Sequence, residues 1–72
     1  IGISYRTEKS VQGNIYIDLG GIDGKIFRSS KVPAGKGNLS WQTSDLGPGM
    51  YFIRFRNAEK SRFRESLFFM GN

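Results

Sequence analysis

The fold is decided by one stretch, Leu46-Gly47-Pro48-Gly49-Met50-Tyr51-Phe52-Ile53-Arg54-Phe55-Arg56, in which a Pro-Gly pair runs into an alternating strand. Proline fixes φ near about −65° and glycine tolerates a positive φ, so the pair predicts a β-turn with Pro48 and Gly49 at its centre. Successive side chains of a strand point to opposite faces. One face therefore carries Tyr51, Ile53 and Phe55, and the other carries Phe52, Arg54 and Arg56.

The same two-residue period recurs along the chain, and no helical period competes with it. It is clearest over residues 11–19, where apolar positions and glycine alternate with Gln12, Asn14, Tyr16 and Asp18, which we expect on the outer face. Asp23-Gly24 then predicts a hairpin turn. Further strands are expected at 1–6, 25–32, 39–43 and 62–70, with Pro33 ending the third strand and a Gly- and Lys-rich loop at 34–38.

Six or seven short strands with turns at this spacing are typical of an all-β sandwich or barrel. A chain of 72 residues makes one small domain, which buries only about 60% of the surface that its unfolded chain exposes. Aromatic residues, at 14%, help to fill so small a core. We expect the core to contain Ile15, Ile17, Leu19, Trp41, Leu46, Tyr51, Ile53 and Phe55.

The composition argues against an enzyme. The chain has no histidine and no cysteine, so a zinc site or a nucleophile activated by histidine is not expected. Its six acidic residues are scattered without the spacing of a calcium loop or of an acid/base pair. We therefore predict no catalytic activity, no metal and no cofactor. A formal net charge of +5 favours anionic partners, or else serves only as a solubilising surface.

The last predicted hairpin concentrates positive charge. If its strands pair so that Arg56 lies opposite Arg62, then Arg54 lies opposite Arg64 and all four share one face. Like charges directly opposite each other are destabilising, so the cluster predicts a docking patch for phosphate, carboxylate or sulfate. The alternative is a solvated face that discourages edge-to-edge aggregation. This register sends Glu65 inward, which a bulge or a salt bridge would resolve.

Aromatic residues allow two further readings. A sugar-binding platform would need several coplanar exposed rings, but Trp41 sits beside Leu39 in an alternating strand and is expected in the core. Tyr16 and Phe52 are expected outward, and they are only two. A groove for single-stranded nucleic acid would need rings beside the arginines. Because alternation places Phe55 on the face opposite Arg54 and Arg56, we predict no nucleic-acid partner.

Three segments in order resemble the C-terminal sorting domain of the type IX secretion system. The first is residues 17–27, which is similar to the family's strand, Asn/Asp-Gly-Lys/Arg turn and following apolar pair. The second is Leu39-Ser40-Trp41 after a Gly-rich loop. The third is residues 46–54, which is similar to the pattern Leu-x-x-Gly-x-Tyr-x-Ile/Leu-x. The chain departs from the family in Gly20-Gly21 and in lacking a lysine near residue 72.

The resemblance implies an Ig-like antiparallel sandwich that performs no chemistry and is read by the outer-membrane secretion machinery after its cargo reaches the periplasm. It implies that residues 1–72 are one C-terminal domain of a larger secreted or cell-surface protein. No apolar run approaches the roughly 20 residues that a transmembrane helix needs, so no transmembrane segment is expected. Some members are cleaved and replaced by a lipopolysaccharide anchor. An accessory carbohydrate-binding module on a secreted polysaccharide-degrading enzyme is the alternative.

The resemblance also assigns expected roles to individual residues. Those expected to meet an acidic translocon surface or anionic lipopolysaccharide are Lys25, Arg54, Arg56, Arg62 and Arg64. Those expected to set turns or to anchor the motif strand are Gly24, Leu46, Pro48, Gly49, Tyr51 and Ile53.

Overall fold

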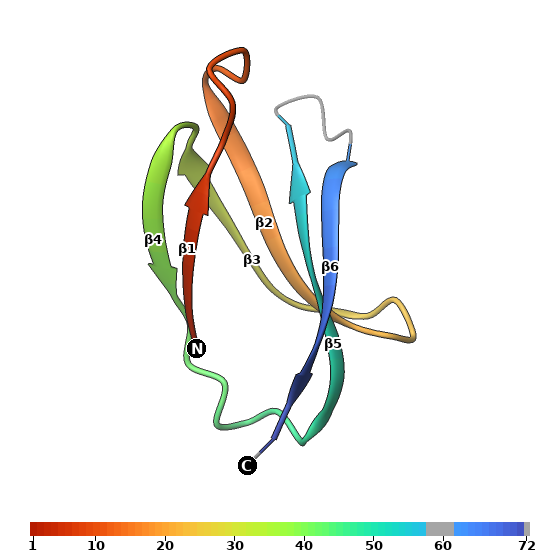
Figure 1. The fold of residues 1–72 in the computed structure, drawn as a ribbon. Coiled ribbons are helices and arrows are strands. Elements are labelled where there is room, and N and C mark those ends of the chain that lie inside the picture. The colour runs from red at the N-terminus through yellow and green to blue at the C-terminus, as the bar shows by residue number, and fades with distance from the viewer. Residues whose placement is uncertain (58–61, 72) are drawn as a thin grey trace.

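The computed structural model describes residues 1–57 and 62–71, and this part of the chain is built of strands without a helix. They form two antiparallel sheets, of order β1-β4 and β3-β2-β5-β6, that pack together as a small Ig-like sandwich (Figure 1). The predicted all-β fold class is confirmed. The strands are β1 (Gly2–Arg6), β2 (Asn14–Gly21), β3 (Ile26–Pro33), β4 (Lys36–Ser40), β5 (Gly49–Arg56) and β6 (Arg62–Met70).

The core lies on the face of β2 that is turned toward the two-stranded sheet. Ile15, Ile17 and Leu19 are completely buried there, and Tyr5 of β1 forms one cluster with Ile15 and Ile17. β2 and β5 are the two central strands of the larger sheet, and β2 is the more buried of them. Removing these side chains from water is the main favourable contribution to folding.

The predicted core is confirmed at its centre and is looser toward its edges. Ile15, Ile17, Leu19 and Tyr51 are buried. The remaining predicted core residues, Trp41, Leu46, Ile53 and Phe55, are only half-buried. For Ile53 and Phe55 on β5 the reason is that a two-stranded sheet cannot cover the whole inner face of a four-stranded one.

Trp41 joins the two sheets. It follows β4, and its backbone extends the pairing with β1, since its N–H donates to the carbonyl of Ile1 at 2.9 Å and its carbonyl accepts from the backbone nitrogen of Ile1 at 2.8 Å. Its ring packs against the core, and its Nε1–H donates to Ser30 Oγ on β3 at 2.9 Å. Trp41 therefore ties the smaller sheet to the larger one.

The fourth strand begins earlier than predicted. β4 covers Lys36–Ser40 instead of 39–43, so much of the predicted loop at 34–38 belongs to a strand. The reason is Tyr5, which pairs with Gly37 and donates from its hydroxyl to the carbonyl of Pro33 at 2.9 Å. A Cβ at Gly37 would lie only 2.6 Å from that hydroxyl, so the missing side chain makes room for the ring. β2 begins at Asn14, later than the alternation predicted.

Two turns frame the motif. The hairpin turn at Asp23-Gly24 is as predicted: Gly24 has φ +94°, and Asp23 Oδ1 accepts from the backbone N–H of Lys25 at 3.1 Å. The turn before β5 is displaced, because its hydrogen bond runs from the N–H of Leu46 to the carbonyl of Thr43 at 3.0 Å. The prediction of a β-turn centred on Pro48 and Gly49 is therefore wrong. Gly49, with φ +154°, is instead the first residue of β5.

The segment between β4 and β5 is held down at both ends. The hydroxyl of Tyr51 donates to the carbonyl of Gly47, which fixes the end of the segment to β5. Arg28 on β3 donates from Nε and Nη2 to the carbonyl of Gln42 at 3.2 and 3.0 Å, and its Nη2 lies 2.6 Å from Asp45 Oδ1. The contacts of Tyr51 and Arg28 therefore fix the position at which β5 begins.

Candidate functional site

The candidate site is the outer face of the four-stranded sheet, the side turned away from β1 and β4. Because Ile15, Ile17 and Leu19 point inward, the alternate residues of β2 and their cross-strand partners share this outer face. The register arranges them in rows across β2, β5 and β6. The rows are Tyr16–Arg56, Asp18–Arg54–Glu65, Gly20–Phe52–Leu67 and Met50–Phe69.

An ion-pair network occupies the middle of this face. Asp18 is only 1% exposed, and its carboxylate oxygens accept from Arg56 Nε at 2.7 Å, Arg56 Nη2 at 3.0 Å and Arg54 Nε at 3.2 Å. Ser29 Oγ on β3 donates to the same carboxylate at 2.6 Å. The alternation along β2 places Asp18 on the outer face, and its carboxylate is nevertheless buried there. The two arginines and the serine cover it.

The hydrogen bonds set the charge state of Asp18. Burial by itself would raise the pKa of this carboxyl, but hydrogen bonds from Arg56, Ser29 and Arg54, with the positive charge of Arg56, outweigh it and hold the pKa below its ordinary value. The carboxylate is therefore ionised at neutral pH. Since it is shared by two guanidinium groups, the three side chains together retain a net positive charge.

We predict that this network makes the domain sensitive to acid. The folded pKa of Asp18 lies below the ordinary value of 3.8, so its contribution to stability is complete above about pH 4 and is lost as the pH falls through the folded pKa. Urea unfolding of the unsubstituted chain should show a fall in stability between neutral pH and pH 3. The variant Asp18→Asn should lose much of that pH dependence, whereas Asp45→Asn should keep it. An equal pH dependence in the chain and in Asp18→Asn would contradict the assignment.

Both arginines also lie over aromatic rings. The guanidinium carbon of Arg56 is 5.1 Å from the ring centroid of Tyr16, and that of Arg54 is 5.3 Å from the centroid of Phe52. Such cation–π contacts contribute roughly 0.5–1 kcal/mol at exposed sites. Phe52 itself is buried, because its ring occupies the space that a side chain at Gly20 would fill. Phe52 therefore lies on the outer face, as predicted, but its ring is buried there.

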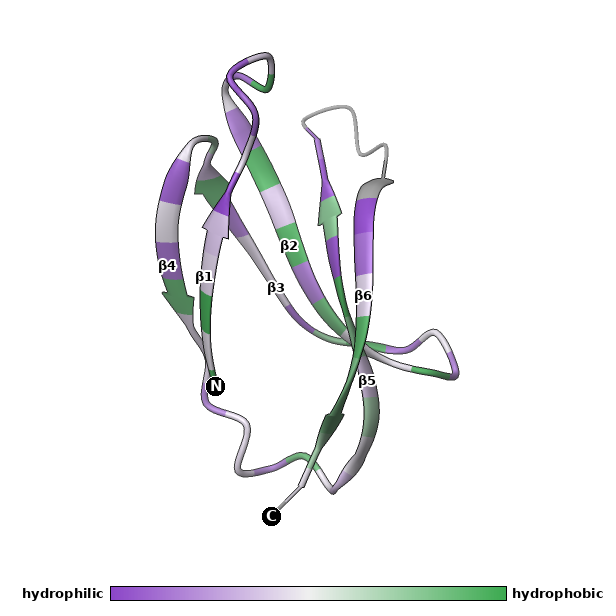
Figure 2. Ribbon diagram, viewed as in Figure 1, coloured by the Kyte–Doolittle hydropathy of each residue, from purple (hydrophilic) through white to green (hydrophobic). Residues whose placement is uncertain are grey.

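Beyond the ion pairs, the face becomes apolar. Met50, Leu67 and Phe69 are 42%, 65% and 69% exposed, and the register places them beside Phe52. Figure 2 shows the change along β6, which is hydrophilic near its start and hydrophobic toward its end. The outer face thus carries charge at one end and exposed apolar side chains at the other.

The predicted four-arginine cluster does not form. A bulge between Phe55 and Arg56 places Arg54 opposite Glu65 and Phe55 opposite Arg64, although Arg56 still pairs with Arg62 in the backbone register. Arg64 therefore lies on the inner side, where it lines a hollow of about 340 Å³. The side chain of Arg62 and the predicted pairing of residues 57 and 61 lie outside the described residues.

The remaining predicted contact residue is separate from the arginines. Lys25 lies in the hairpin between β2 and β3, and its Nζ is 5.4 Å from the ring centroid of Phe27. The structure therefore brings together Arg54 and Arg56 among the predicted cations.

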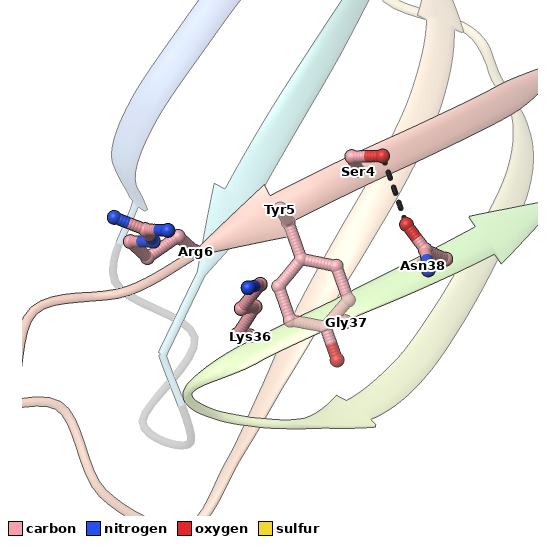
Figure 3. A pocket seen from close by; sticks show the side chains of 6 residues that line it. All are labelled: Ser4, Tyr5, Arg6, Lys36, Gly37 and Asn38. Carbon is pink, nitrogen blue, oxygen red and sulfur yellow. Dashed lines mark hydrogen bonds between the residues drawn. The ribbon is translucent and has the colours of Figure 1, made fainter.

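A second basic pair lies on the smaller sheet. Arg6 of β1 and Lys36 of β4 are direct cross-strand partners, and they border a hollow of about 280 Å³ that also contains Tyr5 and Gly37 (Figure 3). Ser4 Oγ donates to Asn38 Oδ1 at 2.8 Å beside it. Like charges directly opposite each other are destabilising on a sheet.

The roles of Asp18 and Arg28 were not predicted from the sequence. The sequence does contain a signal for the ion pairs of Asp18. An acidic residue in one alternating strand can pair with arginines in another strand if the two strands are neighbours in the sheet. Neighbouring strands could not be read from the sequence. Within the residues that the structure describes, no group of three acidic, histidine or cysteine side chains is placed to hold a metal, and no helix is long and apolar enough to cross a membrane.

Comparison with known protein families identifies the family of the domain that carries this site. The family model of the secretion system C-terminal sorting domain matches residues 1–67. The chain belongs to this family. The resemblance of its three segments to type IX sorting domains is thereby confirmed. Searches of curated proteins and of solved structures find no significant match.

Family membership establishes the general role of the site. Type IX sorting domains mark proteins that are exported to the cell surface or secreted, and they interact with the secretion machinery. They are in general non-catalytic. The outer face is therefore a candidate surface for protein recognition.

Proposed function

We propose that this domain directs the export of a cargo protein through the outer membrane and that it is the C-terminal domain of that larger secreted protein. The observation that carries the proposal is the family match over residues 1–67, which includes the hairpin at Gly24 and the strand of Tyr51 and Ile53. The cargo precedes the domain in the same chain, and the secretion machinery is the partner.

The folded surface supports recognition by an acidic partner. Arg54 and Arg56 are held in place by Asp18 and lie over aromatic rings, so little side-chain freedom is lost when a partner binds. Lys25 is exposed on the adjoining hairpin. These three cations are proposed to contact an acidic surface of the machinery or anionic lipopolysaccharide, whereas Arg64, on the inner side, is not part of this surface. Such contacts weaken as salt rises.

The proposal is tested with a periplasmic reporter in a host that has this secretion system. A reporter fused to the whole domain should reach the cell surface or the medium, and deletion from Leu46 onward should leave it in the periplasm. Charge is tested with Lys25→Glu, which should lower the exported fraction, and with Lys9→Glu as the matched control on the exposed turn before β2. Equal export with and without the domain would refute the proposal.

No observation favours the carbohydrate-binding alternative. Among the aromatic side chains that the structure describes, only Phe69 is exposed, and Tyr16 and Phe52 are covered by guanidinium groups. A sugar platform needs exposed rings that lie together on one face, and the described residues do not provide it.

A further inference from the structure

The edge strands differ in how well they are protected. An edge strand offers unpaired backbone N–H and C=O groups, and natural proteins protect such edges with short strands, charged residues or proline. β1 and β4 have only five residues each and carry Arg6 and Lys36. β3, at one edge of the larger sheet, carries Arg28 and Lys31 and ends at Pro33.

β6, at the other edge of the larger sheet, lacks this protection in its second half. It is nine residues long, and its charged residues precede the run Ser66-Leu67-Phe68-Phe69-Met70. This run has no charge and no proline, and Leu67 and Phe69 are 65% and 69% exposed. A long apolar edge of this kind is a template for pairing with another strand.

We propose that the edge of β6 pairs with β6 of a second copy of this chain, antiparallel and centred on Phe68. In this register Leu67 lies opposite Phe69 of the second copy, Ser66 lies opposite Met70, and the two Phe68 residues face each other. The pairing is self-complementary, as a two-fold dimer interface requires. The two larger sheets become one continuous eight-stranded sheet.

The rows of the outer face favour this occupant. Phe52 already neighbours Leu67, and Met50 neighbours Phe69. The proposed pairing therefore joins the apolar ends of two outer faces into one uninterrupted row, from Phe52 through Leu67 to Phe69 and Met50 of the second copy. On the inner side the two Phe68 rings meet, each already packed against Tyr51 with ring centroids 6.2 Å apart.

The charges do not oppose the pairing. Arg64 is four residues from the centre, so the two copies of Arg64 are about 27 Å apart at about 3.4 Å per residue. That separation is well beyond the screening length of about 8 Å at physiological ionic strength. The net charge of +5 on each copy repels weakly at this range, so the dimer should become tighter as salt increases.

Sedimentation equilibrium on the 72-residue chain tests the dimer. The chain should show a reversible monomer–dimer equilibrium, and the double variants Leu67→Lys/Phe69→Lys and Leu67→Glu/Phe69→Glu should each weaken it at least tenfold, because like charges then face each other across the axis. Mixing the two variants should restore a dimer, because opposite charges then face each other. Because the side chains of Leu67 and Phe69 are exposed, both double variants should still fold, and circular dichroism checks this.

The control is Ile22→Lys, which replaces an apolar side chain that is 73% exposed on the hairpin between β2 and β3. It should leave the dimer unchanged. A chain that stays monomeric at millimolar concentration, or a dimer that survives both double variants, would refute the proposal. A mixture that fails to dimerise while both variants are folded would refute the register. Because export is measured separately, this result does not depend on the sorting function.

Discussion

Replacing Trp41 by alanine is expected to lower the free energy of unfolding by about 3–5 kcal/mol. The indole packs against the core between the sheets, and its N–H holds Ser30 of β3. Alanine would leave a cavity that the neighbouring strands can fill only in part. A domain of 72 residues has roughly 4–11 kcal/mol of stability in total, so this change should remove much of it. Chemical denaturation followed by circular dichroism measures the loss.

The control for Trp41 separates packing from hydrogen bonding. Trp41→Phe keeps most of the ring contact but removes the donor to Ser30, and we expect a loss of about 1 kcal/mol from the hydrogen bond alone. A loss below about 1 kcal/mol in Trp41→Ala would show that the side chain does not connect the sheets.

Replacing Asp18 by alanine should be almost as damaging, with a loss of about 2–4 kcal/mol. The carboxylate accepts hydrogen bonds from Arg54, Arg56 and Ser29, and its removal leaves two guanidinium groups beside each other without an anion between them. The arginine side chains are 25% and 21% exposed and can turn partly toward water, which limits the loss.

Asp45 supplies the matched comparison for Asp18. It also pairs with an arginine, Arg28, but its side chain is 61% exposed, and exposed ion pairs contribute little. Asp45→Ala should therefore change stability much less than Asp18→Ala. A double-mutant cycle of Asp18→Ala with Arg56→Ala should show strong coupling, because the second change removes one of the cations that the first leaves unpaired. Equal effects of the two aspartate variants would contradict the buried network.

The alternation of residues predicted the strands well because it reports which face a side chain joins. It placed Ile15, Ile17 and Leu19 in the core, and all three are buried. It could not report how well each face is covered. Asp18 and Phe52 are on the outer face as their positions require, yet both are buried, because arginines cover one and a glycine on the adjacent strand accommodates the other.

The candidate site depended on details that the sequence pattern does not contain. A single extra residue at the bulge between Phe55 and Arg56 moves Glu65 opposite Arg54 and sends Arg64 to the inner face. Because the side-chain period of a strand is two, a shift of one residue exchanges the faces completely. The predicted cluster of four arginines failed for this reason, and the role of Arg54 and Arg56 in contacting a partner stays a prediction.

The central claim is that the folded domain, and not a short linear segment, is the export signal. The most direct measurement is the exported fraction of one reporter fused either to the unsubstituted domain or to the domain carrying Trp41→Ala together with Asp18→Ala. This double variant leaves the cations Lys25, Arg54 and Arg56 and residues 46–56 unchanged but should unfold the sandwich. We predict that the reporter then accumulates intact in the periplasm. Export at the level of the unsubstituted fusion, with the domain shown to be unfolded, would contradict the account.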